Sequence, residues 1–127
     1  MEKIFEIAGI VVESCYYCGM PATEKEHVIP KAILRAFEDV GIEEIISRRK
    51  LLVRACRECN ALLGSTYQTT LAERKAFLKA ALRDRYRSVL KMKDWTEEKL
   101  SELGPTLRTH VESAMRLKRL TEWRLVW

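Results

Sequence analysis

The chain has 127 residues, of which 47% are hydrophobic and 32% charged, and its formal net charge at pH 7 is +5. This length fits one domain with a modest core, which a bound metal ion would help to stabilise. No apolar run approaches the roughly 18 uninterrupted residues that cross a bilayer, so no membrane partner is expected. The composition is that of a globular protein and excludes a low-complexity chain.

The N-terminal stretch IFEIAGIVV, residues 4–12, is apolar enough for a strand or a short helix. Its β-branched residues favour the strand. Charged residues interrupt or flank this stretch (Glu2, Lys3, Glu6 and Glu13), so it does not look like a secretion signal. We therefore expect a reducing compartment, the cytoplasm.

All four cysteines occur as two C-x-x-C pairs, Cys15 with Cys18 and Cys56 with Cys59. Each pair can hold a metal ion from a tight turn, and two such pairs are best explained by one shared tetrahedral Zn²⁺. Disulfides, redox thiols and an iron–sulfur cluster are the alternatives, and a reducing compartment disfavours the disulfides. We predict a structural zinc site that fastens two segments of the chain together.

Extended and helical patterns alternate between the two cysteine pairs and just after them. The sequence predicts an extended piece at residues 27–29, a helix over about 31–40, and a strand over 51–55 that leads into the second pair. A helical turn is expected over residues 60–63. Gly64 should bend or break that turn.

A long helix is expected to follow. Ser65 with Gln68 matches a capping box, so this helix should begin near Thr66. Its apolar residues recur at spacings of three, four and seven and form one stripe, namely Tyr67, Leu71, Leu78, Leu82, Tyr86 and Val89.

Two further helices are predicted near the C-terminus. Asp94 with Glu97 is a second capping box, which predicts a short helix over about 95–103. Gly104 and Pro105 then open a last helix over about 106–123. His110 falls on a polar flank of that helix, and we expect no catalytic role for it.

Basic residues concentrate in the predicted long helix. Residues 64–93 hold eight Lys or Arg against two acidic residues, whereas the rest of the chain is close to neutral. Such a helix suits a phosphate backbone, because each contact releases counterions, although an ordinary solvated helix face is the alternative. The residues that we expect to contact DNA are Arg74, Lys75, Lys79, Arg83, Arg87 and Lys91.

A zinc ion held by four thiolates is coordinatively closed, so any chemistry needs other residues. Glu26 and His27 lie between the cysteine pairs, and Asn60 directly follows Cys59, so the zinc site would draw them together. Carboxylate and amide oxygens suit Mg²⁺ or Mn²⁺, and an imidazole can deprotonate water; together they serve phosphodiester hydrolysis. Each residue alone also fits a structural role, such as a solvated carboxylate, a hydrogen-bonded histidine or a helix-capping asparagine.

The segment C-Y-Y-C-G-M-P-A-T-E-K-E-H-V-I-P, followed by L-V-R-A-C-R-E-C-N-A-L-L-G, resembles the HNH endonuclease family in its four-cysteine form. That form is similar to McrA-type nucleases and to phage resolvases that cut branched DNA. The resemblance covers about residues 15–64 and implies a ββα-metal fold. It implies that His27 is the general base, that Glu26 and Asn60 hold a catalytic Mg²⁺ or Mn²⁺, and that the cysteines bind structural zinc.

The chain departs from the family pattern at three positions. Glu26 stands where the acidic ligand is usually Asp. Leu51 stands where the family commonly has the middle Asn of its name. Leu63 stands where many relatives have Lys.

The predicted fold class is therefore α+β, with a treble-clef-like ββα finger over residues 1–64 and a helical extension over 65–127 that packs as one unit. The predicted function is a metal-dependent endonuclease that acts on DNA in the cytoplasm, that of the host if the protein is phage-encoded. The alternative is a zinc-stapled nucleic-acid-binding or protein-interaction module that does not cut. Double-strand cleavage needs two active sites, so the C-terminal helices are candidates for a homodimer contact.

Overall fold

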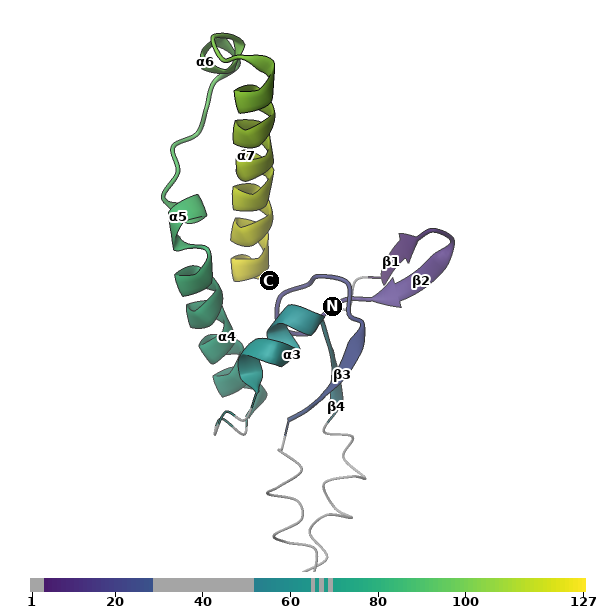
Figure 1. Ribbon diagram of the computed structural model, residues 1–127. Coiled ribbons are helices and arrows are strands. Elements are labelled where there is room, and N and C mark those ends of the chain that lie inside the picture. The colour runs from purple at the N-terminus through teal and green to yellow at the C-terminus, as the bar shows by residue number, and fades with distance from the viewer. Residues whose placement is uncertain (1–3, 29–51, 65, 67, 69) are drawn as a thin grey trace, which may run out of the picture. The chain divides into compact units, whose positions relative to one another are not determined.

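A computed structural model describes residues 4–28, 52–64, 66, 68 and 70–127 (Figure 1). The chain forms two compact units, residues 1–78 and 79–127. Short strands dominate the first unit and helices the second, so the predicted α+β class is confirmed. The predicted helix over 31–40 lies outside the described residues. None of the helices in the described part of the chain is long and apolar enough to span a membrane.

The N-terminal apolar stretch forms a hairpin, not one continuous strand. Strands β1 (Ile4–Ile7) and β2 (Ile10–Glu13) pair antiparallel and are joined by Ala8 and Gly9. These two residues have φ values of 52° and 77°. Positive φ at both positions gives a two-residue turn whose twist matches that of the strands. Alanine seldom occupies such a position, so the sequence pattern does not reveal the turn.

The centre of the first unit is a strand–strand–helix arrangement. Strands β3 (Glu24–His27) and β4 (Leu52–Ala55) pair antiparallel, and helix α3 (Arg57–Leu63) follows and contacts β3. The strand predicted at 51–55 and the helical turn predicted at 60–63 are confirmed, although α3 begins earlier. Helix α3 ends at Gly64, whose φ of 46° is easily adopted only by glycine.

Helix α4 (Leu71–Arg85) begins later than the sequence suggests. The Oγ1 of Thr70 accepts a hydrogen bond from the backbone N–H of Glu73 at 3.1 Å, which caps the helix here rather than near Thr66. Two residues of the predicted apolar stripe, Leu78 and Leu82, are buried, and each is 1% exposed. The long helix also ends early, because the backbone leaves the helical conformation after Arg85.

The second unit also contains α5 (Arg87–Leu90), α6 (Glu97–Ser101) and α7 (Pro105–Val126), of which α5 and α7 contact each other. Both predicted C-terminal helices are confirmed. The cap of α6 differs, because Thr96 and not Asp94 accepts from the backbone N–H of Lys99, at 3.3 Å.

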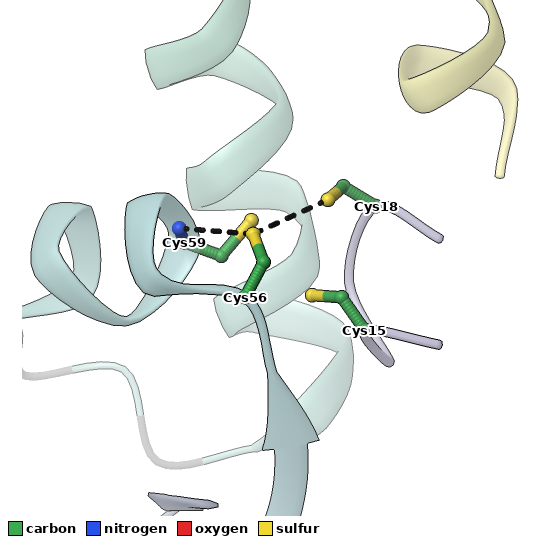
Figure 2. Close-up of side chains that lie close together, drawn as sticks. All are labelled: Cys15, Cys18, Cys56 and Cys59. Atoms are coloured by element: carbon green, nitrogen blue, oxygen red, sulfur yellow. Dashed lines mark hydrogen bonds between the residues drawn. The ribbon is translucent and has the colours of Figure 1, made fainter. Parts of the chain in front are cut away.

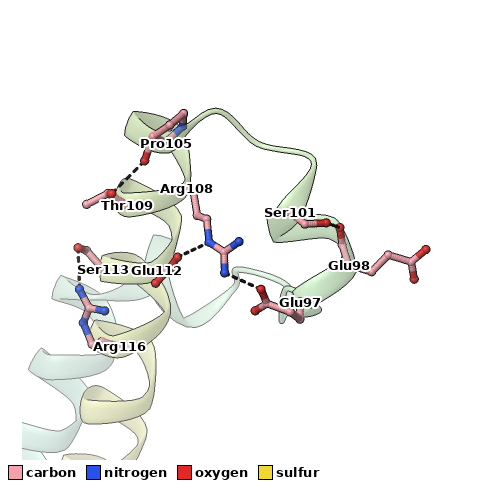
Figure 3. Close-up of polar contacts among 9 residues, drawn as sticks. All are labelled: Glu97, Glu98, Ser101, Pro105, Arg108, Thr109, Glu112, Ser113 and Arg116. Carbon is pink, nitrogen blue, oxygen red and sulfur yellow. Dashed lines mark hydrogen bonds and ion pairs between the residues drawn. The ribbon is translucent and has the colours of Figure 1, made fainter.

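Arg108 ties α6 to α7 (Figure 3). Its Nε donates to Glu112 at 2.7 Å and its Nη2 donates to Glu97 at 2.6 Å. These hydrogen bonds, first that with Glu112 and then that with Glu97, raise the pKa of Arg108. Because the side chains are largely exposed, we expect the network to fix geometry more than to add stability.

Candidate functional site

Cys15, Cys18, Cys56 and Cys59 form a buried cluster in the first unit (Figure 2). Their Sγ atoms all lie within 4.8 Å of one another, and those of Cys18 and Cys56 are 3.6 Å apart. Four thiolates about 2.3 Å from a tetrahedral Zn²⁺ have sulfurs about 3.8 Å from each other, so the cluster fits that ion. All four thiols are free, so no disulfide competes for them. The predicted clustering of the four cysteines is confirmed.

The backbone brings the two cysteine pairs together from separate segments, as Figure 2 shows. In the first segment, Gly19 has a φ of 79° and its N–H donates to the carbonyl of Cys15 at 2.9 Å, which closes a tight turn. In the second, Cys56 caps α3, since its Sγ accepts from the N–H of Cys59 at 3.4 Å. A backbone hydrogen bond of 2.9 Å from Tyr16 to the carbonyl of Arg54 joins the two segments.

Four thiols packed this closely share negative charge unequally. Hydrogen bonds from Cys18, Cys56 and Cys59 hold the pKa of Cys15 well below its usual range. The hydrogen bond with Cys15 in turn raises the pKa of Cys59 far above its usual range. A divalent cation removes this conflict, because all four sulfurs can then bind it as thiolates.

Glu26 lies in a different environment from the one expected. Its side chain is only 4% exposed, and its Oε2 accepts a hydrogen bond of 2.7 Å from the hydroxyl of Tyr17. Its Oε1 forms an ion pair with Nη2 of Arg74, whose side chain is 1% exposed. Burial, and then the hydrogen bond to Glu26, raises the pKa of Tyr17. Both carboxylate oxygens therefore have buried protein partners, an environment typical of an internal counter-ion rather than of an open metal position.

The structure places Asn60 beside a different acid. Its Nδ2 donates to Oε2 of Glu24 at 2.5 Å, and Glu24 also pairs with Arg57 at 3.8 Å. Glu24 lies in a charged run that looks solvated, so the sequence does not mark it as a site residue. His27 is the last residue of β3, and side chains alternate along a strand. The faces of β3 therefore separate His27 from Glu24 and Glu26.

Among the described residues, the four cysteines are the one group of three or more Cys, His, Asp or Glu side chains that could hold a metal ion together. Asn60 is not of these residue types, so its predicted role as a ligand stays a prediction. The geometry directs it toward Glu24 and not toward Glu26.

Three of the six residues expected to contact nucleic acid have other partners. Arg74 is buried in its pair with Glu26, so the prediction that it contacts DNA is corrected: a side chain so covered offers nothing to a phosphate. Lys79 is half-buried, and its Nζ donates to the carbonyl of Leu125 at 2.5 Å. The Nζ of Lys75 lies 5.8 Å from the centre of the Tyr16 ring.

The other three predicted contacts are exposed. Arg83 and Lys91 lie on the surface of the second unit. Arg87 is exposed as well and forms an ion pair with Asp84, one turn earlier. An exposed pair of this kind is worth little, so Arg87 can exchange its partner for a phosphate. These three residues keep the chemistry that the prediction requires.

Comparisons of this chain with protein-family models, with curated proteins and with solved structures found no match.

Proposed function

We propose that this protein is an HNH-type endonuclease that hydrolyses phosphodiester bonds in DNA, with His27 as the general base. The observation that carries the proposal is the order of elements around the cysteine cluster. Strand β3 ends at His27, β4 leads into Cys56, and α3 carries Asn60 directly after Cys59. This strand–strand–helix order is what the resemblance of residues 15–64 to the HNH family implies.

In the proposed reaction His27 takes a proton from a water molecule as the water oxygen attacks phosphorus. The bond from phosphorus to the leaving oxygen breaks, and solvent returns a proton to that oxygen. Histidine suits this role because its neutral ring accepts a proton near neutral pH. His27 is partly buried and is the last residue of β3.

The proposal includes a divalent ion, Mg²⁺ or Mn²⁺. Glu24 and Asn60 fit such an ion, because they offer carboxylate and amide oxygens and are already adjacent. Glu26 does not fit, because Tyr17 and Arg74 occupy both its oxygens. Because Glu24 and His27 lie on opposite faces of β3, an ion at Glu24 and Asn60 would hold β3 to α3 and would not touch a phosphate beside His27.

A second candidate function is a zinc-stapled nucleic-acid-binding module that does not cut. The observation that favours it is the buried ion pair of Glu26, which removes the acid expected beside His27 from the ligand set. In this case the cysteine cluster would serve only as a scaffold.

The test is nicking of supercoiled plasmid DNA with Mg²⁺ or Mn²⁺. We expect the native protein to nick, and His27→Ala to be slower by roughly 10²–10⁴-fold, the usual contribution of a general base. The matched control is His110→Ala, which removes the other of the two histidines, on the exposed part of α7. This control should nick like the native protein.

Further arms of the experiment separate the two candidates. If neither the native protein nor His110→Ala nicks DNA that both of them bind, the non-cleaving module is supported and the nuclease is rejected. Equal nicking by His27→Ala and the native protein would reject His27 as the base.

A further inference from the structure

We propose that the outer face of the β3–β4 pair, formed by Lys25, His27, Leu52 and Arg54, binds the phosphate backbone of a nucleic acid. This inference rests on the proposed function, because it supplies the substrate contact beside His27. It relocates part of the predicted binding surface from the basic helix to the finger itself.

The strand register defines this face. Lys25 lies directly opposite Arg54, and His27 lies opposite Leu52. Side chains alternate along a strand, so these four residues share one face, and Glu24 and Glu26 lie on the other. Burial agrees with this division, because Glu26 and Ala55 are buried on the inner face. On the outer face Lys25 and Arg54 are exposed and Leu52 is 45% exposed.

Two cations opposite each other are unfavourable for an isolated strand pair, because like charges repel across the ladder. Only Arg54 has compensation, from Glu13 at 3.3 Å, and both of these side chains are 46% exposed. In the described part of the chain no carboxylate pairs with Lys25. An exposed ion pair such as that of Arg54 is weak and screened by salt, so a phosphate can replace Glu13. A bound polyanion would turn the repulsion into attraction.

The position of the two cations selects a nucleic acid as the occupant. Residues two apart on a strand are separated by about 7 Å, so a phosphate held between Lys25 and Arg54 lies next to His27. Leu52 adds an apolar surface beside the histidine, which suits the sugar between two phosphates. The face thus combines charge for the backbone with His27, the proposed general base for the water that attacks phosphorus.

The experiment measures binding of a short DNA duplex by fluorescence anisotropy across a range of NaCl concentrations. The double variant Lys25→Gln with Arg54→Gln is made in the His27→Ala background, so that the result does not depend on cleavage. We expect at least tenfold weaker binding at low salt. The slope of log affinity against log salt should fall by about 0.9, since the variant loses the one phosphate that Lys25 and Arg54 hold between them.

The matched control removes two exposed charges elsewhere, Lys99→Gln with Arg119→Gln, and should bind like its parent. All variants should keep the zinc content of the parent, which checks that the finger is folded. An unchanged affinity and salt slope in the Lys25 and Arg54 variant would overturn the proposal. So would binding of poly-glutamate as tight as that of DNA, because the face would then be an unselective anion site.

The two proposals fail in distinguishable ways. Absence of nicking by the native protein rejects the nuclease but leaves the binding result untouched. Loss of DNA binding in the double variant then still assigns the outer face to nucleic acid. If the native protein nicks DNA and the double variant binds DNA as its parent does, only the proposal for the outer face is rejected.

Discussion

Burial of Glu26 determines what this carboxylate can do. A charged group at 4% exposure is costly unless it is paired and hydrogen-bonded, and Arg74 and Tyr17 supply both requirements. Arg74 also donates from Nη1 to the carbonyl of Gln68 at 2.6 Å. The pair therefore connects the start of α4 to β3 through the interior of the first unit, and Glu26 acts there as a counter-ion.

Removal of one member of this pair should be much worse than removal of both. We expect Arg74→Met or Glu26→Gln to lower the free energy of unfolding by about 3–5 kcal/mol, because each leaves a buried charge or polar group without its partner. The double variant Glu26→Leu with Arg74→Met should recover most of this loss. Urea denaturation measures these values, with Arg83→Met as an exposed control that changes stability by about 0.5 kcal/mol or less.

The same measurement tests Glu26 as a metal ligand. If Glu26 bound Mn²⁺, the ion would stabilise the native protein and not Glu26→Gln. Stabilisation of this kind, or single variants as stable as the native protein, would contradict its role as a counter-ion.

The sequence predicts contacts between residues where the spacing of those residues along the chain carries the chemistry. Two C-x-x-C pairs predict that the four cysteines cluster, because each pair supplies two of the four ligands that one tetrahedral ion needs. Glu26 and Arg74 lie 48 residues apart, and no local pattern links them. A Glu-Lys-Glu run looks solvated, so neither the burial of Glu26 nor the contact between Glu24 and Asn60 could be predicted.

Local capping and strand register decide where the elements lie. Helix α4 begins at Leu71 because the Thr70 side chain accepts the N–H of Glu73. The capping box of Ser65 with Gln68 predicted an earlier start, because such a pattern does not by itself fix where the helix begins. The turn at Ala8 was hidden for a similar reason, since alanine is not a turn residue and adopts positive φ there.

The cap of α4 can be tested by substitution of Thr70. Thr70→Ala should lower the free energy of unfolding by about 1 kcal/mol, because one N–H at the start of the helix loses its partner. Thermal denaturation followed by circular dichroism measures the change. Thr70→Ser keeps the hydroxyl and should behave nearly like the native protein. An equal loss in both variants would assign the effect to the threonine methyl group and not to the cap.

The molecule consists of two units, and different interactions stabilise the interior of each. The first unit contains the cysteine cluster and the buried ion pair, whereas the second is built from helices around side chains such as Leu82 and Leu100. The sequence predicted a boundary after residue 64, but the units divide within α4. The first half of α4 belongs to the first unit because Arg74 pairs with Glu26.

Removal of zinc should therefore affect the two units differently. All three tryptophans lie in the second unit, at positions 95, 123 and 127, so their fluorescence reports on that unit alone. We expect a strong thiolate-competing chelator, or Cys56→Ser with Cys59→Ser, to unfold the first unit while tryptophan emission stays unchanged. Proteolysis should then cut within the first 78 residues and spare the rest. A shift of tryptophan emission on zinc loss would show that the units fold as one.

The placement of the four thiols along the chain has a consequence for biosynthesis. Cys18 and Cys56 are 38 residues apart, so at about 5–20 residues per second the ribosome releases the second pair roughly 2–8 s after the first. During that interval the nascent polypeptide offers a metal only half of its final coordination sphere. Arg74 emerges later still, so Glu26 has no partner in Arg74 until after the last cysteine has been made. Translation thus delivers all four cysteines before Arg74, the charge that is buried against Glu26.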